Sequence, residues 1–320
     1  MTPLNGADAP HQPILYEIMT RSIHIQAPAK INAALSVGPP AEDGMHPICS
    51  WMLTIDLHDE MTLTALEPDR LSRYAIMWHE DALQRREIDW SLTSDLAVRA
   101  HQSIEKHVGR PLPVQMKLEK RIPLGGGLGG GSSDAAAMLR GINTLFDLSL
   151  TDDVLESLGS KLGSDIPFLV RGGSAIVEGT GERVEHLPMT PDVHAVLVLP
   201  EMGCETGAVY RKLDEMDPTT VDPAAVRSLA ESGFDGDRLF NDLADPALKV
   251  APGLGNIREQ LAGIAGLPVH VSGSGSTLFI ACADVAAATA LAAEIQSTTG
   301  LSTIPVSAID HGAGILGDPS

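Results

Sequence analysis

The sequence predicts a two-domain protein of mixed α and β structure. The chain has 320 residues, and a single hydrophobic core usually divides beyond about 250–300 residues. Hydrophobic residues make up 43% of the chain and charged residues 20%, as in ordinary globular proteins. Strand-like and helix-like segments are interspersed along the chain. The pattern changes near Pro188–Asp192, so we expect one domain over residues 21–187, a second over 188–320, and a loose extension over 1–20.

The first domain is predicted to begin with strands. Ile23 and Ile25 alternate with polar neighbours, and an apolar run follows at Ala33–Val37. The next segment is rich in proline, glycine and acids, which is typical of a turn. A helix is expected over Asp95–Val108. Apolar and polar residues then alternate over Val114–Leu118, which predicts a strand.

Helices become more frequent in the rest of the chain. One is expected over Ser133–Phe146, whose serine-rich start suits N-capping, and another over Thr151–Leu162. The remaining expected elements are a strand at Val193–Leu199, helices near Ala208–Met216 and Pro223–Glu231, a helix before Gly266, strands at Val269–Ser272 and Thr277–Ala281, a helix at Asp284–Gln296 and a strand at Thr303–Ala308.

A glycine-rich loop separates the Val114–Leu118 strand from the helix that follows it. Six of its seven positions, Gly125–Gly131, are glycine. Without side chains, the backbone can approach an anion closely and turn successive N–H groups inward. The following helix directs its free N–H groups and its positive dipole end at the same place. We expect a phosphate-binding loop, in which Ser132 and Ser133 add hydroxyl groups for phosphate or magnesium; a flexible turn is the alternative.

Two other types of phosphate-binding loop fit this segment less well. Gly125, Gly127 and Gly130 match the spacing of the dinucleotide-binding fingerprint. That fold needs a parallel sheet and an acid about 20 residues further on, whereas Asp147 and Asp152 lie at a helix-to-helix junction. The Walker pattern fails because the loop ends in Gly-Ser-Ser without the lysine. A dehydrogenase is therefore disfavoured.

Three motifs, in order along the chain, resemble those of the GHMP kinases, a superfamily of small-molecule kinases. They are Ala27–Asn32, Pro123–Ser133 and the C-terminal glycine loop Val271–Thr277. Within the superfamily, the Asp43–His46 turn, Leu162–Phe168 and Asn241–Leu243 are most similar to the 4-diphosphocytidyl-2-C-methyl-D-erythritol kinases. The resemblance implies an α+β fold, with an N-terminal ribosomal-protein-like β/α domain, a C-terminal ferredoxin-like domain and the active site between them.

The resemblance also implies a reaction and two catalytic residues. The reaction is phosphorylation by ATP, with Mg²⁺, of the 2-hydroxyl of 4-diphosphocytidyl-2-C-methyl-D-erythritol, a cytidine-diphosphate-linked polyol, in non-mevalonate isoprenoid precursor biosynthesis. Asp165 would orient that hydroxyl and take its proton, and Lys30 would supply positive charge. A lysine in an apolar strand is costly unless it meets an acid or a phosphate, which favours a pair with Asp165. The alternatives are a turn cap for Asp165 and a surface position for Lys30.

The same resemblance implies the binding residues. Those expected to bind ATP are Lys120, Pro123, Leu124, Gly125, Gly126, Gly127, Leu128, Gly129, Gly130, Gly131, Ser132 and Ser133. Those expected to bind the acceptor are Asn32, His46, Ser272, Gly273, Ser274 and Gly275. Asn32 shares a strand face with Lys30, and His46 offers a ring and two nitrogens to cytosine. A solvated Lys120 and a plain strand-connecting turn at 272–276 are the alternatives.

One residue departs from the family pattern. Met45 stands where the Asp-Gly-x-His turn usually has tyrosine. This keeps open another GHMP-type kinase with a sugar, homoserine or mevalonate-like acceptor. A catalytically inactive nucleotide-binding relative is a further alternative, against which Asp165 argues. No carboxylate stands out as a magnesium ligand.

Charge and cysteine content exclude several other classes. The net charge of −20 repels polyanions, so nucleic-acid binding is not expected. The cysteines Cys49, Cys204 and Cys282 are far apart, which argues against both a disulfide framework and a Cys-x-x-Cys metal site. No apolar run approaches the roughly 20 residues of a membrane helix. We expect a cytoplasmic protein that is a monomer or a homodimer.

Overall fold

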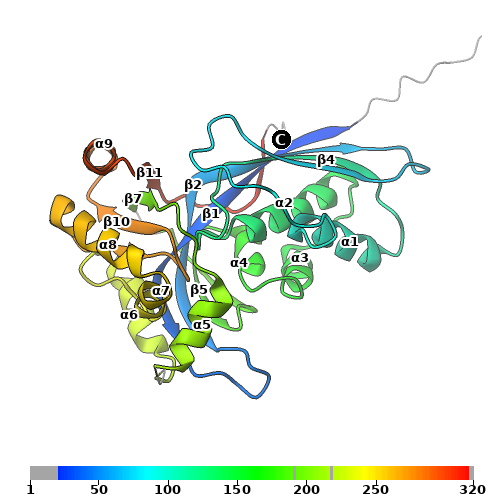
Figure 1. Ribbon diagram of the computed structural model, residues 1–320. Helices are drawn as coiled ribbons and strands as arrows, with labels where there is room; N and C mark the ends of the chain where they lie inside the picture. The colour runs from blue at the N-terminus through cyan, green and yellow to red at the C-terminus, as the bar shows by residue number, and fades with distance from the viewer. Residues whose placement is uncertain (1–20, 190–191, 217–218, 317–320) are drawn as a thin grey trace, which may run out of the picture.

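The computed structural model describes residues 21–189, 192–216 and 219–316. The expectation for residues 1–20 therefore lies outside the described residues. The chain forms two β-sheets with helices around them (Figure 1). The strands of the first sheet are β1 (Ser22–Val37), β2 (Ile48–Ala65), β3 (Arg73–Trp78), β4 (Val114–Lys120), β5 (Ser174–Gly179), β6 (Arg183–Leu187), β8 (Phe240–Asn241) and β12 (Gly314–Leu316).

The first sheet is built on the long antiparallel pair of β1 and β2. β2 is long enough to pair with two further strands, with β5 over residues 48–53 and with β4 over residues 60–65. Both pairings are antiparallel, and only β3–β4 and β1–β8 are parallel. This arrangement differs from the parallel sheet of a dinucleotide-binding fold.

Among the described residues, the first half of the chain has four helices, which pack on this sheet or on one another. They are α1 (Leu96–Val108), α2 (Gly130–Leu145), α3 (Asp152–Gly159) and α4 (Ile166–Arg171). α2 packs on both β1 and β2 and also contacts the other three helices. α1 begins where expected, because the Asp95 carboxylate accepts hydrogen bonds from the N–H groups of Ala97 and Val98. The alternation predicted for β4 is also confirmed, since Val114, Met116 and Leu118 are all buried.

The second sheet has the ferredoxin-like order. Its strands are β7 (His194–Leu199), β9 (His270–Val271), β10 (Leu278–Cys282) and β11 (Ser302–Ser307). They are arranged β11-β7-β10-β9, and all neighbours are antiparallel. With helices between β7 and β9 and between β10 and β11, this is the split β-α-β arrangement that was predicted. The helices of this half are α5 (Thr206–Asp214), α6 (Pro223–Ser232), α7 (Ala244–Val250), α8 (Pro252–Ala265) and α9 (Val285–Thr299).

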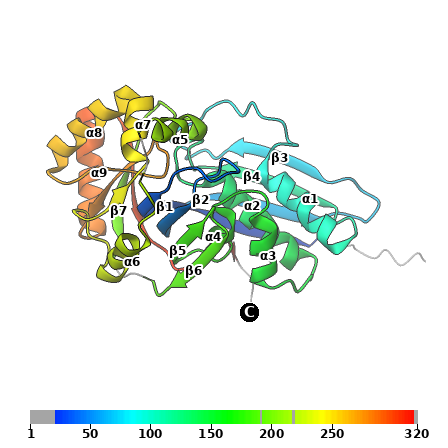
Figure 2. The same cartoon turned by 90° about the horizontal axis from the view of Figure 1, so that it is seen from below.

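The β1–β2 pair joins the two halves of the molecule. Figures 1 and 2 show these strands running from the helices α1–α4 to the second sheet. Ile31 and Leu53 pack there in one hydrophobic cluster with Leu197 and Phe279 of the second sheet. Trp51 is fully buried in the same cluster, and its Nε1 donates to Ser174 Oγ at 2.9 Å. The two sheets therefore share a continuous core.

The start of α2 and the pairing of β8 and β12 were not expected from the sequence. α2 begins at Gly130, three residues before the predicted start, and Gly129 is its N-cap, so Ser133 does not cap the helix. Only glycine fits at 130, because a Cβ there would lie 2.9 Å from Ile122 Cγ2. β8 and β12 come from the second segment but add to β1 in the first sheet. The boundary at residue 188 remains a prediction.

Two predictions about the whole chain can also be compared with the structure. All three cysteines are free thiols. Among the described residues, no helix combines the length and the apolar character that crossing a bilayer requires.

Candidate active site

A cavity of about 700 Å³ lies where β1, the glycine-rich loop, α5 and the β9–β10 turn meet. This volume is within the usual range for small-molecule sites, roughly 300–1,000 Å³. Most of the residues predicted to act in catalysis or to bind ATP or the acceptor line it. They are Lys30, Asn32, His46, Lys120, Pro123, Leu124, Gly125, Gly126, Gly127, Leu128, Gly129, Gly130, Gly131, Ser132, Asp165, Gly273 and Ser274. Ser133, Ser272 and Gly275 are not among the residues that line it.

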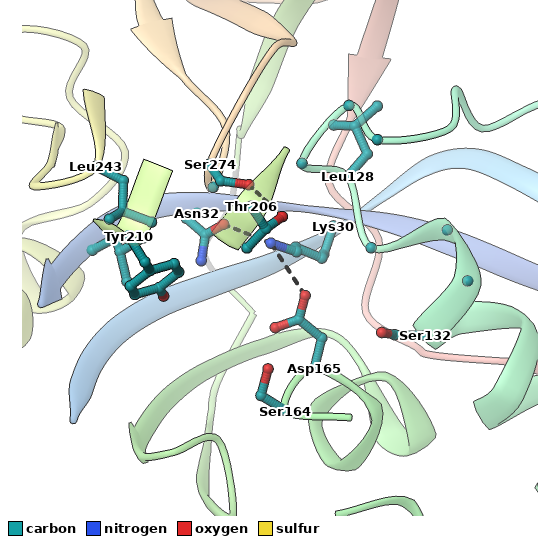
Figure 3. A pocket seen from close by; sticks show the side chains of 18 of the residues that line it. Lys30, Asn32, Leu128, Ser132, Ser164, Asp165, Thr206, Tyr210, Leu243 and Ser274 are labelled. Atoms are coloured by element: carbon teal, nitrogen blue, oxygen red, sulfur yellow. Dashed lines mark hydrogen bonds and ion pairs between the residues drawn. The ribbon is translucent and has the colours of Figure 1, made fainter. Parts of the chain in front are cut away.

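Lys30 and Asp165 form an ion pair inside the cavity (Figure 3). Lys30 Nζ lies 3.4 Å from Asp165 Oδ2 and donates to Asn32 Oδ1 at 2.7 Å. Lys30 is only 4% exposed, so the surface alternative is wrong. Asp165 occupies the N-cap position of α4, but its side chain makes no capping hydrogen bond. The predicted pair is confirmed, and the carboxylate is directed into the cavity instead of toward the helix.

Glycines on two loops make room for Lys30. Its N–H donates to Leu128 O at 2.9 Å, which fixes β1 to the first glycine loop (Gly125–Gly131). A Cβ at Gly129 would lie 2.9 Å from Lys30 Cγ, and one at Gly273 would lie 3.4 Å from Lys30 Nζ. A side chain at position 129 would therefore collide with the lysine stem, and one at position 273 would touch its ammonium group.

The first glycine loop has the backbone shape of an anion site. Gly125, Gly127 and Gly129 all have positive φ, at 66°, 76° and 72°. Alternation of left-handed with other conformations directs successive N–H groups toward one concave side. α2 then begins at Gly130, so its unpaired first N–H groups face the same cavity. Ser132 lines the cavity in the first turn of α2.

The second glycine loop (Ser272–Ser276) packs directly against the first. Ser272 Oγ donates to Gly127 O at 3.1 Å, and the Thr277 N–H donates to Gly126 O at 3.2 Å. The N–H groups of Ser272 and Gly275 are used inside the turn, where they donate to Thr277 O and Ser272 O. Only the tip, Gly273 and Ser274, reaches the cavity. The loop is thus a strand-connecting turn whose tip is also part of the lining.

His46 lines the cavity, and each of its ring nitrogens lies close to an oxygen atom of the protein. Nδ1 donates to Gly38 O at 2.8 Å, and Nε2 lies 3.4 Å from Asp214 Oδ1. The ring centroid is 4.9 Å from that of Tyr210. Burial raises the pKa of Tyr210 to about 12, and the negative charge of Asp165 adds to this. The aromatic group next to His46 therefore comes from α5.

Sequence reasoning missed the part of the site that α5 supplies. Thr206, Tyr210 and Asp214 all line the cavity, and they are spaced four residues apart. Positions i, i+4 and i+8 lie on one helix face, and the buried Val209 and Leu213 lie directly beside that face. The signal was a polar and aromatic stripe next to an apolar one.

Lys120 is buried beside the cavity, with its ammonium held by two acids. Its ammonium donates to Asp59 Oδ2 at 2.6 Å and to Asp134 Oδ2 at 2.5 Å, and the residue is 2% exposed. The solvated position is therefore wrong for Lys120. Its side chain borders the cavity, but two acids hold its charged end.

Comparison with known proteins gives the family. Residues 95–173 match the family described as GHMP kinases N terminal domain. A 4-diphosphocytidyl-2-C-methyl-D-erythritol kinase from Pseudarthrobacter chlorophenolicus is 34% identical over 315 residues, which cover 93% of this chain and 96% of that relative. The enzyme of the same name from Bacillus cereus is 37% identical over 259 residues, covering 80% and 86%.

Solved structures agree with these matches. The crystal structure of a 4-(cytidine 5'-diphospho)-2C-methyl-D-erythritol kinase superposes with a TM-score of 0.71 at 30% identity, covering 89% of this chain and 99% of that one. A homoserine kinase from Cytophaga hutchinsonii superposes at 0.69 with 16% identity, covering 94% and 99%, and so shares the fold alone. Because identity above 30% extends over nearly the whole sequence, the chain belongs to the GHMP kinases and, within them, to the family of 4-diphosphocytidyl-2-C-methyl-D-erythritol kinases.

Proposed function

We propose that this protein transfers the γ-phosphoryl group of ATP to the 2-hydroxyl of 4-diphosphocytidyl-2-C-methyl-D-erythritol, a step of isoprenoid precursor biosynthesis. The observation that carries the proposal is the Lys30–Asp165 pair at the junction of the two glycine loops. Phosphoryl transfer needs a cradle for phosphate, a group that accepts the hydroxyl proton, and a cation for the developing charge. The cavity brings all three together.

Asp165 and Lys30 divide the chemical work. The acceptor hydroxyl gives its proton to the Asp165 carboxylate, and its oxygen forms a bond to the γ-phosphorus. The bond between that phosphorus and the oxygen bridging to the β-phosphate breaks, and ADP leaves with the electron pair. The Lys30 ammonium, 3.4 Å from Asp165, stabilises negative charge near the reacting oxygens. Asn32, which accepts a hydrogen bond from Lys30, is placed to hold the acceptor.

The residues fit a magnesium ion that arrives with the nucleotide. Among the described residues, no group of three His, Cys, Asp or Glu side chains forms a metal site. Magnesium bound to nucleotide takes one or two protein oxygens and completes its shell with phosphate and water. Ser132 and Asp165 are two of the oxygen-bearing side chains that line the cavity, and they would hold such an ion. When bound, it would neutralise negative charge on the phosphates.

The cytidine end of the acceptor is assigned to the α5 side of the cavity. Tyr210 and Met45 both line that end, and Met45 is half exposed. A cytosine ring stacks on an aromatic face, so Tyr210 takes the stacking role that a tyrosine in the turn would have, because this chain has Met45 at that position. Nδ1 of His46 already donates to Gly38 O, which leaves Nε2, the ring face and the backbone for the base.

The assay that tests this function supplies the purified protein with ATP and Mg²⁺ and one acceptor at a time. The acceptors are 4-diphosphocytidyl-2-C-methyl-D-erythritol, homoserine, mevalonate and a hexose. We expect ADP formation above background with the cytidine compound alone. Turnover of homoserine, mevalonate or the hexose in preference to it would overturn the acceptor assignment, and ATP binding without any turnover would favour an inactive relative.

Tyr210→Ala is expected to raise KM for the cytidine acceptor by about 5- to 150-fold, because stacking of a base on an aromatic ring is worth roughly 1–3 kcal/mol. KM for ATP should stay close to that of the wild type. Steady-state kinetics with each substrate varied in turn measures both constants. Tyr210→Phe is the matched control, since it keeps the ring and should keep KM for the acceptor. Equal KM values in the alanine variant and the wild type would remove Tyr210 from the acceptor site.

A further inference from the structure

Lys120, Asp59 and Asp134 form a buried charged group, which we call the anchor cluster. Its members come from β4, β2 and the second turn of α2. We propose that the anchor cluster is a positioning device for ATP binding: it ties the two ends of the first glycine loop together, and Lys120 acts through the loop and not as a phosphate ligand. The proposal rests on ATP being the ligand of that loop.

The strand end of the loop is fixed to Asp59. Asp59 is fully buried, and its Oδ2 accepts the hydrogen bond from the Lys120 ammonium at 2.6 Å. Its Oδ1 accepts from the backbone N–H groups of Arg121 and Ile122, the latter at 2.8 Å. One carboxylate therefore holds three consecutive residues immediately before Pro123. The chain enters the loop from a fixed position and direction.

The helix end of the loop returns to the same point. Lys120 also donates to Asp134 Oδ2 at 2.5 Å, so a single ammonium joins the end of β4 to the start of α2. Gly130, the first residue of α2, lies so close that a Cβ would be 2.9 Å from Ile122 Cγ2 and 3.7 Å from Asp59 Oδ2. The loop of residues 123–129 thus begins and ends next to the anchor cluster.

The charge balance of the anchor cluster does not suit a purely stabilising role. Two carboxylates share one ammonium in a buried place, and Asp134 Oδ1 is buried without a hydrogen-bond partner among the described residues. Burial raises the pKa of Asp134, and the charge of Asp59 adds to the rise while Lys120 opposes it. Buried ion pairs are often no more stable than well-packed apolar groups. A geometric function explains why such a costly arrangement sits at this position.

The competing explanation is that Lys120 contacts a phosphate directly. The two explanations differ in what they predict for the acids that hold Lys120. Lys120 lines the cavity, whereas neither Asp59 nor Asp134 does. Two of the three N–H donors of the ammonium are already taken by the acids. If Lys120 were a phosphate ligand, removing Asp134 would leave ATP binding unchanged or improve it by freeing the lysine. If the anchor cluster positions the loop, removing Asp134 weakens ATP binding.

The decisive variant is Asp134→Ala. It leaves Lys120 and Asp59 as a one-to-one pair and puts alanine, a strong helix former, into α2. We expect an unchanged or higher Tm together with a Kd for ATP raised about tenfold or more, which is at least roughly 1.4 kcal/mol. KM for the acceptor should not change. A merely structural residue would show the opposite pattern, a lower Tm with ATP affinity intact in the folded fraction.

The ATP dissociation constant is measured by titration without acceptor, so the result does not depend on which acceptor the enzyme uses. Lys117→Ala is the matched control. Lys117 lies on the same strand, pairs with Glu119 at 2.8 Å and has a side chain that is 46% exposed, so its loss should leave both Tm and Kd unchanged. An Asp134→Ala variant that binds ATP as tightly as the wild type overturns the proposal. Failure of the wild type to bind ATP would instead overturn the proposed function.

Lys120→Met provides a second measurement. Alone, it leaves two buried carboxylates without their cation, so we expect a lower Tm. Combining it with Asp134→Ala removes one of those charges, and the two backbone N–H groups still serve the remaining Asp59. We expect the double variant to recover Tm but not the affinity for ATP. Recovery of both would contradict the positioning role.

Discussion

Asp165→Asn is expected to lower kcat by about 100- to 10,000-fold, the usual contribution of a general base. Asparagine has nearly the same size and still offers an oxygen to Lys30, but it cannot take the proton of the acceptor hydroxyl. KM for ATP should change little, because the phosphate cradle is built from backbone on the opposite side of the cavity. Steady-state ADP release at saturating acceptor measures the effect.

Asp214→Asn is the control for this experiment. Asp214 is an acid in the same cavity, but its carboxylate lies 3.4 Å from His46, whereas Lys30 pairs with Asp165. Its replacement should leave kcat within a few-fold of wild type. Turnover by Asp165→Asn at the rate of the wild type would show that another group receives the proton, and the mechanism given above would then be wrong.

Gly127→Ala should nearly abolish ATP binding and should also lower Tm. Gly127 has φ of 76°, which costs a residue with a Cβ about 1–3 kcal/mol. A Cβ there would also lie 2.1 Å from the carbonyl oxygen of Ser272, so the second glycine loop would have to move. Both loops that line the cavity would shift together. Calorimetric titration with ATP and a thermal melt of the same sample measure the two effects.

Gly125→Ala separates backbone strain from this clash. Gly125 also has positive φ, at 66°, but no heavy atom lies within 4 Å of the position its Cβ would occupy. We expect this variant to lose part of its ATP affinity and to keep a Tm much nearer that of the wild type. Equal losses in the two variants would show that contact between the loops is not what requires glycine at 127.

Local patterns along the chain were sufficient to predict most elements and the centre of the site. The alternation in β4 and the Asp95 cap of α1 are short-range effects, so they are legible from neighbouring residues. The Lys30–Asp165 pair is long-range, but burying a lysine among alanines and isoleucines demands an opposite charge. Only the family motif indicated which of the many acids provides it.

The start of α2 was predicted wrongly because a tertiary contact overrides local propensity. Ser133 is a good N-cap by residue type, and glycine is a poor helix residue. The helix nevertheless begins at Gly130, since Ile122 occupies the space a side chain would need. Such a contact joins residues on either side of the loop, and it cannot be predicted from the pattern of neighbouring residues.

The anchor cluster and the α5 face were not predictable for a related reason. Asp59 meets Lys120 because β2 and β4 are neighbours in register, although 61 positions separate them in the chain. Tyr210 reaches His46 only when the second half of the molecule is placed against the first. The charged and aromatic residues could be identified in the sequence, but which of them contact one another depends on how the strands and helices are arranged.

The pairing of β8 and β12 with β1 has a consequence for how the polypeptide can be divided. Both short strands are encoded after residue 188, yet they hydrogen-bond to the first long strand of the protein. A protein that ends at residue 188 would lack β8 and β12. The edge of its first sheet would then be open to association with other chains. The two halves are therefore interleaved, and we expect the first half expressed by itself to lack part of its sheet.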